Sequence, residues 1–332
     1  MHRGILGTIG SPLVQVESPP GSVIAAKVES KNPGGSAKDR PAVAMIEAAE
    51  RDGLLSPGDR IVEPTSGNTG IGISLVAAAK GYEATIVMPA DKSPERRAIM
   101  RAYGADLELV DGDISDAKDR ADEIEREAGA VQLGQFDNPA NPESHYRTTA
   151  EEILTQIGPR EPDALVAGVG TGGTLSGTAR RLREAFPDMD VVAVEPEGNT
   201  PIKTGEGGHD DFQGMGPGFV SSNTDTALID GVEVVSLEAA EAECRRLARE
   251  EGILVGQSSG ASNIAARRVA ERLADPDADC PAPDNTTGIL GDGDGYGDGV
   301  LTADGNEGPD CPLVLTVYWD SGERYVSTGM FD

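Results

Sequence analysis

Short apolar runs and amphipathic stretches alternate along most of the chain. Runs with the length and composition of buried strands occupy residues 23–28, 61–63, 84–88 and 106–110. Stretches with helical periodicity occupy residues 42–51 and 95–103. Alternation of this kind predicts a doubly wound α/β fold. The 332 residues are enough for two packed lobes, each of which buries its own core.

Acidic residues strongly outnumber basic ones. The chain has 57 Asp and Glu residues against 28 Lys and Arg residues, a formal net charge of −29. A surface of that sign repels nucleic-acid phosphates, so nucleic-acid binding is disfavoured. Because the excess is spread along the chain, it favours a protein that works in concentrated salt, where screening removes the self-repulsion. The alternative is an acidic protein without salt adaptation.

Neither the cysteines nor the start of the chain carries a recognisable signal. No C-x-x-C or zinc spacing joins the three cysteines Cys244, Cys280 and Cys311, so neither a disulfide framework nor a structural metal is expected. The three histidines form no metal motif either. Residues 1–9 are too polar and too short for a signal peptide. We therefore expect a soluble cytoplasmic protein with no membrane contact.

Lys38 is the first candidate for chemistry. It stands in the turn-rich segment 32–40 and is one of only seven lysines. A lysine amine forms Schiff bases with carbonyl compounds once burial or a neighbouring cation lowers its pKa. The alternative is a solvated surface lysine.

A second candidate is the segment 65–70, Thr-Ser-Gly-Asn-Thr-Gly, which lies between a strand-like run at 60–63 and an alanine-rich helical run at 73–80. At such a strand-to-helix turn the free backbone N–H groups and the helix dipole favour an anion. A substrate carboxylate would suit this turn. The alternative is an ordinary turn in which Ser or Asn caps the helix.

A third candidate is the glycine-rich segment 168–174, which follows the apolar run 164–167 and precedes a helical run that begins at Leu175. Glycines allow close backbone approach and threonines add hydroxyl donors, so the segment predicts a phosphate site. It also matches G-x-G-x-x-G, and Glu195 ends the next predicted strand, where an acid would bind a ribose. A nicotinamide-dependent dehydrogenase is therefore a competing hypothesis.

In this order, the three segments resemble those of the cysteine synthase and cystathionine β-synthase family. These are pyridoxal-phosphate (PLP) enzymes of the tryptophan-synthase β-like fold, PLP fold type II. The resemblance extends over nearly the whole chain through residues 9–14, 63–70, 88–97, 135–142, 252–261 and 320–325. It implies two doubly wound α/β lobes with the cofactor between them. Residues 1–45 and 151–332 would form the larger, PLP-binding lobe, and residues 46–150 the smaller lobe that closes on substrate.

The resemblance also implies a role for each candidate residue. Lys38 matches the lysine that binds the PLP aldehyde, and Asn68 the asparagine that hydrogen-bonds the phenolic oxygen of PLP. Ser258 matches the serine that faces the pyridine nitrogen, with the adjacent Ser259 as the alternative. The residues that match the phosphate loop are Gly170, Thr171, Gly172, Gly173 and Thr174. Those that match the groups holding the substrate carboxylate are Thr65, Ser66, Gly67, Thr69 and Gln135.

The activity that the resemblance implies is β-replacement, which makes L-cysteine from O-acetyl-L-serine and sulfide through an aminoacrylate. Lys38 would also remove the Cα proton as general base. A neutral hydroxyl at Ser258 would not hold the ring nitrogen protonated, which favours β-elimination over transamination. The family forms homodimers, and cysteine synthases can bind the C-terminal tail of serine acetyltransferase.

Alternative functions remain. A cystathionine β-synthase would condense serine or an activated serine with homocysteine instead of sulfide. A nicotinamide-dependent (NAD) dehydrogenase is disfavoured because it leaves Lys38, Asn68 and Ser258 without a joint role. A non-catalytic module that only binds a partner would not need Lys38.

Residues 275–310 depart from the family and are rich in Asp, Gly and Pro, which predicts a solvated surface loop. Asp292, Asp294 and Asp298 imitate part of a calcium-binding loop. The twelfth position is Ala303 where such a loop has glutamate, so calcium binding is disfavoured.

Overall fold

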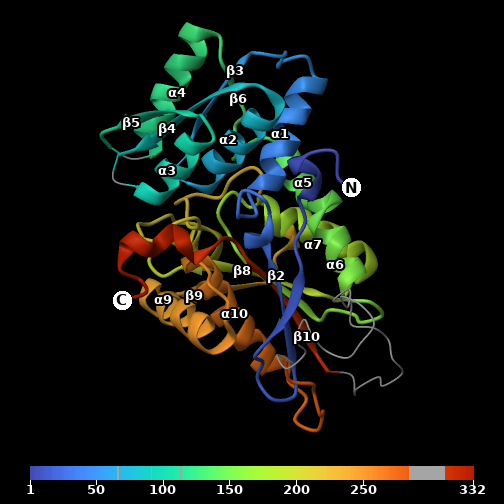
Figure 1. The fold of residues 1–332 in the computed structure, drawn as a ribbon. Coiled ribbons are helices and arrows are strands. Elements are labelled where there is room, and N and C mark those ends of the chain that lie inside the picture. Colours follow the sequence, from blue (N-terminus) through green and yellow to red (C-terminus); the bar gives the residue numbers. More distant parts are fainter. Residues whose placement is uncertain (66, 91, 113, 284–310) are drawn as a thin grey trace.

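The computed structural model describes residues 1–65, 67–90, 92–112, 114–283 and 311–332. Two sheets and the helices around them form two bodies, stacked as the upper and lower halves of Figure 1. Several strands are buried at every position, as expected where helices cover both faces of a sheet. The α/β class that the alternation predicts is therefore confirmed.

The larger sheet has six strands in the order β1-β2-β10-β7-β8-β9. Its strands are β1 (Leu13–Val16), β2 (Val23–Val28), β7 (Ala164–Gly168), β8 (Asp190–Pro196), β9 (Gly231–Val235) and β10 (Leu313–Tyr318). All neighbours are parallel except β1, which runs antiparallel to β2. Strand β10 comes from the end of the chain and inserts between β2 and β7, with Val314 opposite Ile24 on one side and Ala164 on the other.

The smaller sheet has four parallel strands in the order β5-β4-β3-β6. Its strands are β3 (Arg60–Pro64), β4 (Glu83–Pro89), β5 (Asp106–Val110) and β6 (Val131–Gln132). The lobe boundaries that the resemblance implies stay a prediction.

The helices of the described residues connect and cover these strands. They are α1 (Asp39–Arg51), α2 (Asn68–Lys80), α3 (Pro94–Ala102), α4 (Ile114–Ala128), α5 (Ala140–Arg147), α6 (Thr149–Gln156), α7 (Gly173–Ala185), α8 (Pro201–Thr204), α9 (Leu237–Arg246) and α10 (Gln257–Leu273). Shorter 3-10 or π turns are η1 (Ile5–Thr8), η2 (Glu29–Lys31), η3 (Thr226–Leu228), η4 (Leu247–Glu251) and η5 (Gly322–Thr328).

Separate apolar cores fix these layers. On one face of the larger sheet, Ala240 of α9 and Val269 of α10 pack against the strands. On the other face, Ile153 of α6 and Leu182 of α7 do so. The smaller sheet packs against α1, α2 and α3 on one side and against α4 on the other. Burial of apolar side chains on both faces stabilises both sheets.

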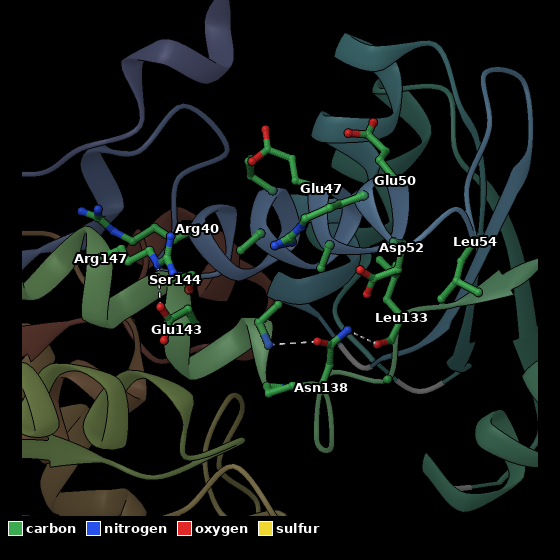
Figure 2. A pocket seen from close by; sticks show the side chains of 18 of the residues that line it. Arg40, Glu47, Glu50, Asp52, Leu54, Leu133, Asn138, Glu143, Ser144 and Arg147 are labelled. Carbon is green, nitrogen blue, oxygen red and sulfur yellow. Dashed lines mark hydrogen bonds and ion pairs between the residues drawn. The ribbon is translucent and has the colours of Figure 1, made fainter.

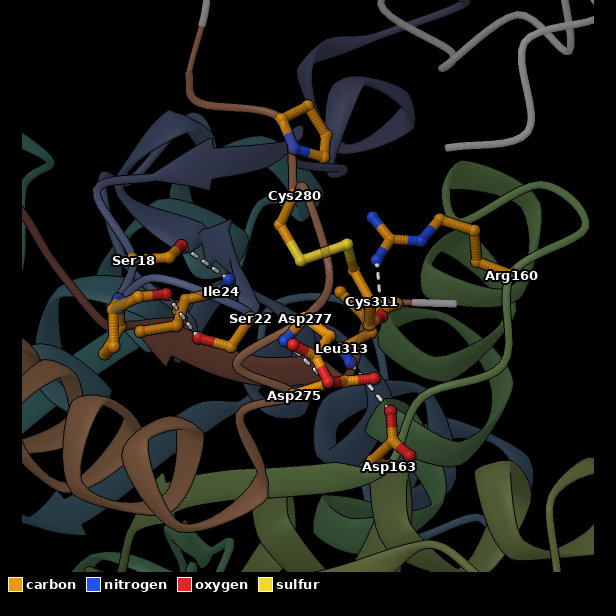
Figure 3. Close-up of a disulfide and its surroundings, with 12 residues drawn as sticks. Ser18, Ser22, Ile24, Arg160, Asp163, Asp275, Asp277, Cys280, Cys311 and Leu313 are labelled. Carbon is orange, nitrogen blue, oxygen red and sulfur yellow. Dashed lines mark hydrogen bonds between the residues drawn. A yellow bond between two sulfur atoms is a disulfide. The ribbon is translucent and has the colours of Figure 1, made fainter. Parts of the chain in front are cut away.

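A disulfide joins Cys280 to Cys311 (Figure 3), so the expectation that the cysteines form no disulfide framework was wrong for this pair. Their Cα atoms lie 5.7 Å apart, within the usual range for a disulfide. Cys311 leads into β10, and Gln15 Nε2 of β1 donates to Pro281 O, next to Cys280. The insertion of β10 beside β2 brings the two cysteines together, which no short spacing in the sequence reveals.

Some predictions fall outside the described part of the chain. The aspartates Asp292, Asp294 and Asp298 and also Ala303 lie within 284–310, so the calcium hypothesis remains an expectation. Among the residues the structure describes, no helix combines the length and apolar character needed to cross a bilayer. Over the same residues, no group of three or more acidic, cysteine or histidine side chains is arranged to hold a metal ion.

Candidate active site

Lys38 lies immediately before α1, with its side chain in a cavity at the carboxyl ends of β7 and β10. The cavity is also lined by Gly168, Gly170, Thr171, Gly172, Thr174, Leu175, Gly214, Met215, Ser258 and Trp319. The Lys38 amine is 5.5 Å from the ring centre of Trp319. The structure therefore brings the candidate lysine, the glycine-rich loop and Ser258 into one place.

The environment of Lys38 favours its neutral amine. The residue is half-buried, and its amine lies deep enough for desolvation to lower its pKa from the usual 10.5. Asp320 and Glu29 oppose this shift through their charges, without reversing it. An amine with a lowered pKa has a larger neutral fraction, which is the form that attacks carbonyl carbon and accepts protons.

The glycine-rich loop wraps the start of α7. Gly172 has φ +78°, and a Cβ there would lie 2.0 Å from Thr224 Oγ1. A Cβ at Gly173 would lie 2.1 Å from Asn141 Oδ1. Only glycine fits both positions, and the first N–H groups of α7 have no acceptor within the helix. Together with the helix dipole, they form an anion site.

Two buried side chains that the sequence prediction missed hold this loop. Asn141 Nδ2 donates to Thr171 Oγ1 over 3.0 Å. His145 is within hydrogen-bond distance of Thr174 Oγ1 through Nε2 (3.1 Å) and of Thr149 Oγ1 through Nδ1 (2.9 Å). Burial lowers the pKa of His145 to about 3, so its ring is neutral. Both residues belong to α5. Asn141 lies in the segment 135–142, which the sequence prediction noted only for its family likeness, and His145 lies three residues beyond it.

Ser258 and Ser259 have different surroundings. Ser258 lies in the first turn of α10 and lines the Lys38 cavity. Ser259 instead accepts the backbone N–H of Trp319 on its Oγ, over 2.9 Å. The geometry therefore favours Ser258 as the residue that meets a ligand of Lys38.

The segment that follows β3 places several polar groups together. Gly67 N donates to Thr65 Oγ1 over 3.2 Å, and Thr69 Oγ1 donates to Gln135 Oε1 over 2.6 Å. Thr65, Thr69 and Gln135 are all buried. Asn141 connects this group to the glycine-rich loop, since its Nδ2 also donates to Gln135 O over 2.8 Å. Ser66 is outside the described residues.

Glu63 fixes the backbone next to these polar groups. Its carboxylate accepts three backbone N–H groups, from Leu133, Gly134 and Gln135, at 3.0–3.1 Å. Burial raises the pKa of Glu63 to about 7, against the opposing effect of these hydrogen bonds. The carboxylate thus fixes the backbone that carries Gln135. The sequence shows Glu63 only as the end of a strand, so this role was missed.

Asn68 begins α2, next to the Lys38 cavity. It is not among the described residues that line that cavity. Its Nδ2 donates to Asp320 Oδ2 over 2.7 Å, and its Oδ1 accepts from Arg324 Nη1. Helix α2 comes close to the lysine because Gly72 has no side chain, and a Cβ there would lie 2.8 Å from Lys38 O. Asn68 is therefore placed near Lys38 and held by the C-terminal segment.

Glu195, the acid of the dehydrogenase hypothesis, has another partner. Its carboxylate accepts the N–H groups of Ile202 and Lys203, over 2.7 and 3.0 Å, at the start of α8. It therefore satisfies helix donors that would otherwise be unpaired. This occupation weakens the dinucleotide hypothesis.

A much larger hollow of about 1440 Å³ lies elsewhere, between α1, β6 and α5 (Figure 2). Arg40, Glu47, Asn138, Glu143 and Arg147 are among the side chains around it. None of the residues that line it is a predicted site residue. Size alone therefore does not mark the site of chemistry.

The residues around Lys38 fit pyridoxal phosphate. They offer an amine for its aldehyde, N–H and hydroxyl donors for its phosphate, and the Ser258 hydroxyl for its ring nitrogen. Free space in the cavity is only about 10 Å³, room for about one water molecule.

Comparison with known proteins gives a consistent answer. A family model described as pyridoxal-phosphate dependent enzyme matches residues 5–279. A cysteine synthase of Staphylococcus aureus (strain N315) is 48% identical over 252 residues, covering 75% of this chain and 81% of the relative. An O-ureido-L-serine synthase of Streptomyces lavendulae is 40% identical over 337 residues, covering 100% and 93%.

A solved structure supports the same conclusion for the fold. The crystal structure of an O-acetylserine dependent cystathionine β-synthase from Helicobacter pylori matches with a TM-score of 0.83 at 33% identity, covering 100% of this chain and 99% of that one. The expected cofactor, pyridoxal phosphate, and the expected fold are thereby confirmed. The chain belongs to the pyridoxal-phosphate dependent enzymes of fold type II, in the family of the cysteine synthases and cystathionine β-synthases.

Proposed function

We propose that this enzyme is a cysteine synthase, which replaces the acetate of O-acetyl-L-serine with sulfide. The observation that carries the proposal is the convergence of Lys38, the loop from Gly170 to Thr174 and Ser258 on one cavity. Asn141 links that cavity to the buried pair Thr69 and Gln135. The cysteine synthases among the relatives support this choice of reaction.

Lys38 has two tasks in this proposal. Bound pyridoxal phosphate supplies an electron sink that makes the Cα proton of the substrate acidic. Nζ of Lys38 holds the cofactor at rest and later accepts the Cα proton as general base. Its lowered pKa raises the neutral fraction of the amine for both tasks. A solvated lysine would be almost fully protonated at neutral pH.

The other residues bind and orient. The N–H groups at the start of α7, with Thr174, hold the phosphate. The hydroxyl of Ser258 meets the pyridine nitrogen without adding a charge. Thr65, Ser66, Gly67, Thr69 and Gln135 hold the substrate carboxylate, so that Cα faces Lys38 and acetate leaves from Cβ. Sulfide, as HS⁻, then bonds to Cβ in its place, and the Lys38 ammonium returns a proton to Cα.

The test is product formation by purified protein loaded with pyridoxal phosphate in concentrated salt. We expect cysteine from O-acetyl-L-serine and sulfide, and none with Lys38→Ala. Release of acetate without cysteine, in the presence of sulfide, would contradict the assignment. A Lys203→Ala variant, at an exposed lysine outside the cavity, is the matched control.

A second candidate is the condensation of the same donor with homocysteine. It is favoured by the match to an O-acetylserine dependent cystathionine β-synthase over the whole chain. The segment 213–220, which contains the cavity residues Gly214 and Met215, is the expected acceptor region. Competition between sulfide and homocysteine for one donor, read as the ratio of cystathionine to cysteine, decides between the two candidates.

We also infer a cytoplasmic homodimer that can bind the C-terminal tail of serine acetyltransferase. Family membership supports this proposal. The disulfide between Cys280 and Cys311 is unusual for most cytoplasmic proteins. A count of free thiols in protein trapped directly from cells measures whether the bond forms there. Light scattering measures whether the particle contains two 34.4 kDa chains.

A further inference from the structure

Two residues of the C-terminal segment 320–325 form hydrogen bonds with the side-chain amide of Asn68, one at its nitrogen and one at its oxygen. Asp320 Oδ2 accepts from Asn68 Nδ2 over 2.7 Å. Arg324 Nη1 donates to Asn68 Oδ1. Both ends of one amide thus meet charged groups that lie more than 250 residues away in the sequence.

The two charges permit a single orientation of the amide. A carboxylate only accepts hydrogen bonds and a guanidinium only donates them. Rotating the Asn68 amide by half a turn would place its oxygen against Asp320 and its NH₂ against Arg324. Both bonds would be lost, and each is a charge-assisted bond of the stronger kind.

The clamping groups are themselves fixed. Asp320 and Arg324 are 0% and 4% exposed. Tyr325 OH donates to Asp320 Oδ2 over 2.9 Å, and Arg324 Nη2 donates to Gly34 O in the turn before Lys38. A Cβ at Gly35 would lie 2.7 Å from Arg324 Nη2, so the glycine admits the guanidinium. Burial holds these groups in place, which a solvated pair would not achieve.

Among the residues that the structure describes, Asp320 is the only acceptor for the Asn68 amide N–H groups, which leaves one of the two without a partner there. Asn68 carries two N–H bonds on Nδ2, and Asp320 takes one of them. Asn68 is only half-buried, whereas its two partners are buried. The remaining N–H is therefore available to a ligand that binds beside Lys38.

We propose that Asp320 and Arg324 are positioning residues, which lock the Asn68 amide so that its second N–H donates to the phenolic oxygen of bound pyridoxal phosphate. This inference rests on the proposed function and on the role that the family resemblance implies for Asn68. It gives a function to the terminal segment 320–325, whose likeness to the family had no assigned role.

The test is a double-mutant cycle read by cofactor affinity. Trp319 is the only tryptophan and lines the cavity, so quenching of its fluorescence reports binding of pyridoxal phosphate. We expect Asp320→Asn to weaken binding about tenfold, the effect of losing about one charge-assisted hydrogen bond. In an Asn68→Ala background, the same substitution should retain only the smaller effect of the Asp320 charge on the Lys38 amine.

Two controls keep the inference falsifiable. Glu323→Gln removes a negative charge from the same segment at an exposed position and should leave affinity unchanged. Arg324→Gln should repeat the cycle with the same dependence on Asn68, and it replaces Asp320→Asn if that variant does not fold. Equal losses for Asp320→Asn with and without Asn68 would overturn the inference. Failure of the unaltered protein to bind pyridoxal phosphate would instead overturn the proposed function.

Discussion

Two lysines in this chain occupy the protein interior with opposite consequences. Lys27 of β2 is 0% exposed, and its Nζ donates to Ser11 O, to Glu152 Oε2 over 2.6 Å and to Gln156 Oε1 over 2.8 Å. Lys38 has no hydrogen bond or ion pair from its Nζ to any other described residue. Its amine faces a cavity beside Trp319.

Burial lowers the pKa of both amines, so a lowered pKa does not by itself distinguish them. The difference lies in bonding. Lys27 is surrounded by acceptors for its three protons and belongs to a network with Glu152, Arg40 and Glu29. Lys38 keeps its lone pair accessible when neutral. Unmet bonding capacity beside a cavity, rather than burial, is what makes Lys38 the proposed reactive lysine.

The largest expected effect is on activity at Lys38. Lys38→Ala removes the proposed cofactor anchor and the proposed base, so cysteine formation should fall at least about 1000-fold. The unfolding midpoint in urea should change little because no hydrogen bond of the amine is lost. Turnover within about tenfold of the unaltered protein would show that another group acts as base.

The next effect is on stability at Lys27. Lys27→Met leaves the Glu152 carboxylate without one of its cations and should cost about 3–5 kcal/mol in the free energy of unfolding. The folded fraction should still bind pyridoxal phosphate. The matched control is Lys118→Met, since Lys118 forms an exposed 3.0 Å pair with Asp122. That substitution should cost less than about 1 kcal/mol. Equal costs at both positions would refute the structural role of Lys27.

A smaller effect is expected for Glu29, a carboxylate in the same network as Lys27. Desolvation raises the pKa of Glu29, but the charge and hydrogen bonds of Arg40 together with the hydrogen bond from Ser11 outweigh it and lower the pKa to about 2, from an ordinary 4.5. A carboxyl with a depressed pKa contributes stability that is present above pH 4.5 and lost as pH falls toward 2. Glu29→Gln should therefore reduce the loss of stability over that range, measured by urea unfolding at each pH. An unchanged slope would mean that Glu29 titrates normally.

The smallest expected effect is the salt dependence of the loss in unfolding free energy that Lys27→Met causes. Salt should stabilise the whole protein because its net charge is −29, and its melting temperature should rise with added potassium chloride. The cost of Lys27→Met should vary by less than about 0.5 kcal/mol over the same range, because buried pairs are weakly screened. A cost that disappears in concentrated salt would place Lys27 in a solvated environment.

Local patterns predicted much of the fold. The predicted strands 23–28 and 106–110 coincide with β2 and β5. Helix α2 begins at Asn68, five residues before the predicted Ile73. The prediction began late because the first turns contain glycines, which have weak helix propensity. Close packing explains these glycines: a Cβ at Gly72 would lie 2.8 Å from Lys38 O, and a Cβ at Gly70 would lie 2.8 Å from Met100 Sδ, contacts that only the folded structure shows.

The candidate site also contains residues that local patterns predicted and residues that they did not. Lys38 and the loop from Gly170 to Thr174 were identifiable because glycine-rich turns between a strand and a helix have a known physical use. The supporting roles of Glu63, Asn141 and His145 depend on contacts between distant segments. The pairing of Cys280 with Cys311 depends on where β10 inserts. No local pattern contains that information.

The most direct test of the difference between the two lysines is chemical. Protein loaded with pyridoxal phosphate is reduced with borohydride, digested and mapped by mass spectrometry, which locates the pyridoxyl group among the seven lysines. We predict labelling of Lys38 alone, with none at Lys27. A label on Lys27, or on no lysine while the cofactor remains bound, would contradict the account.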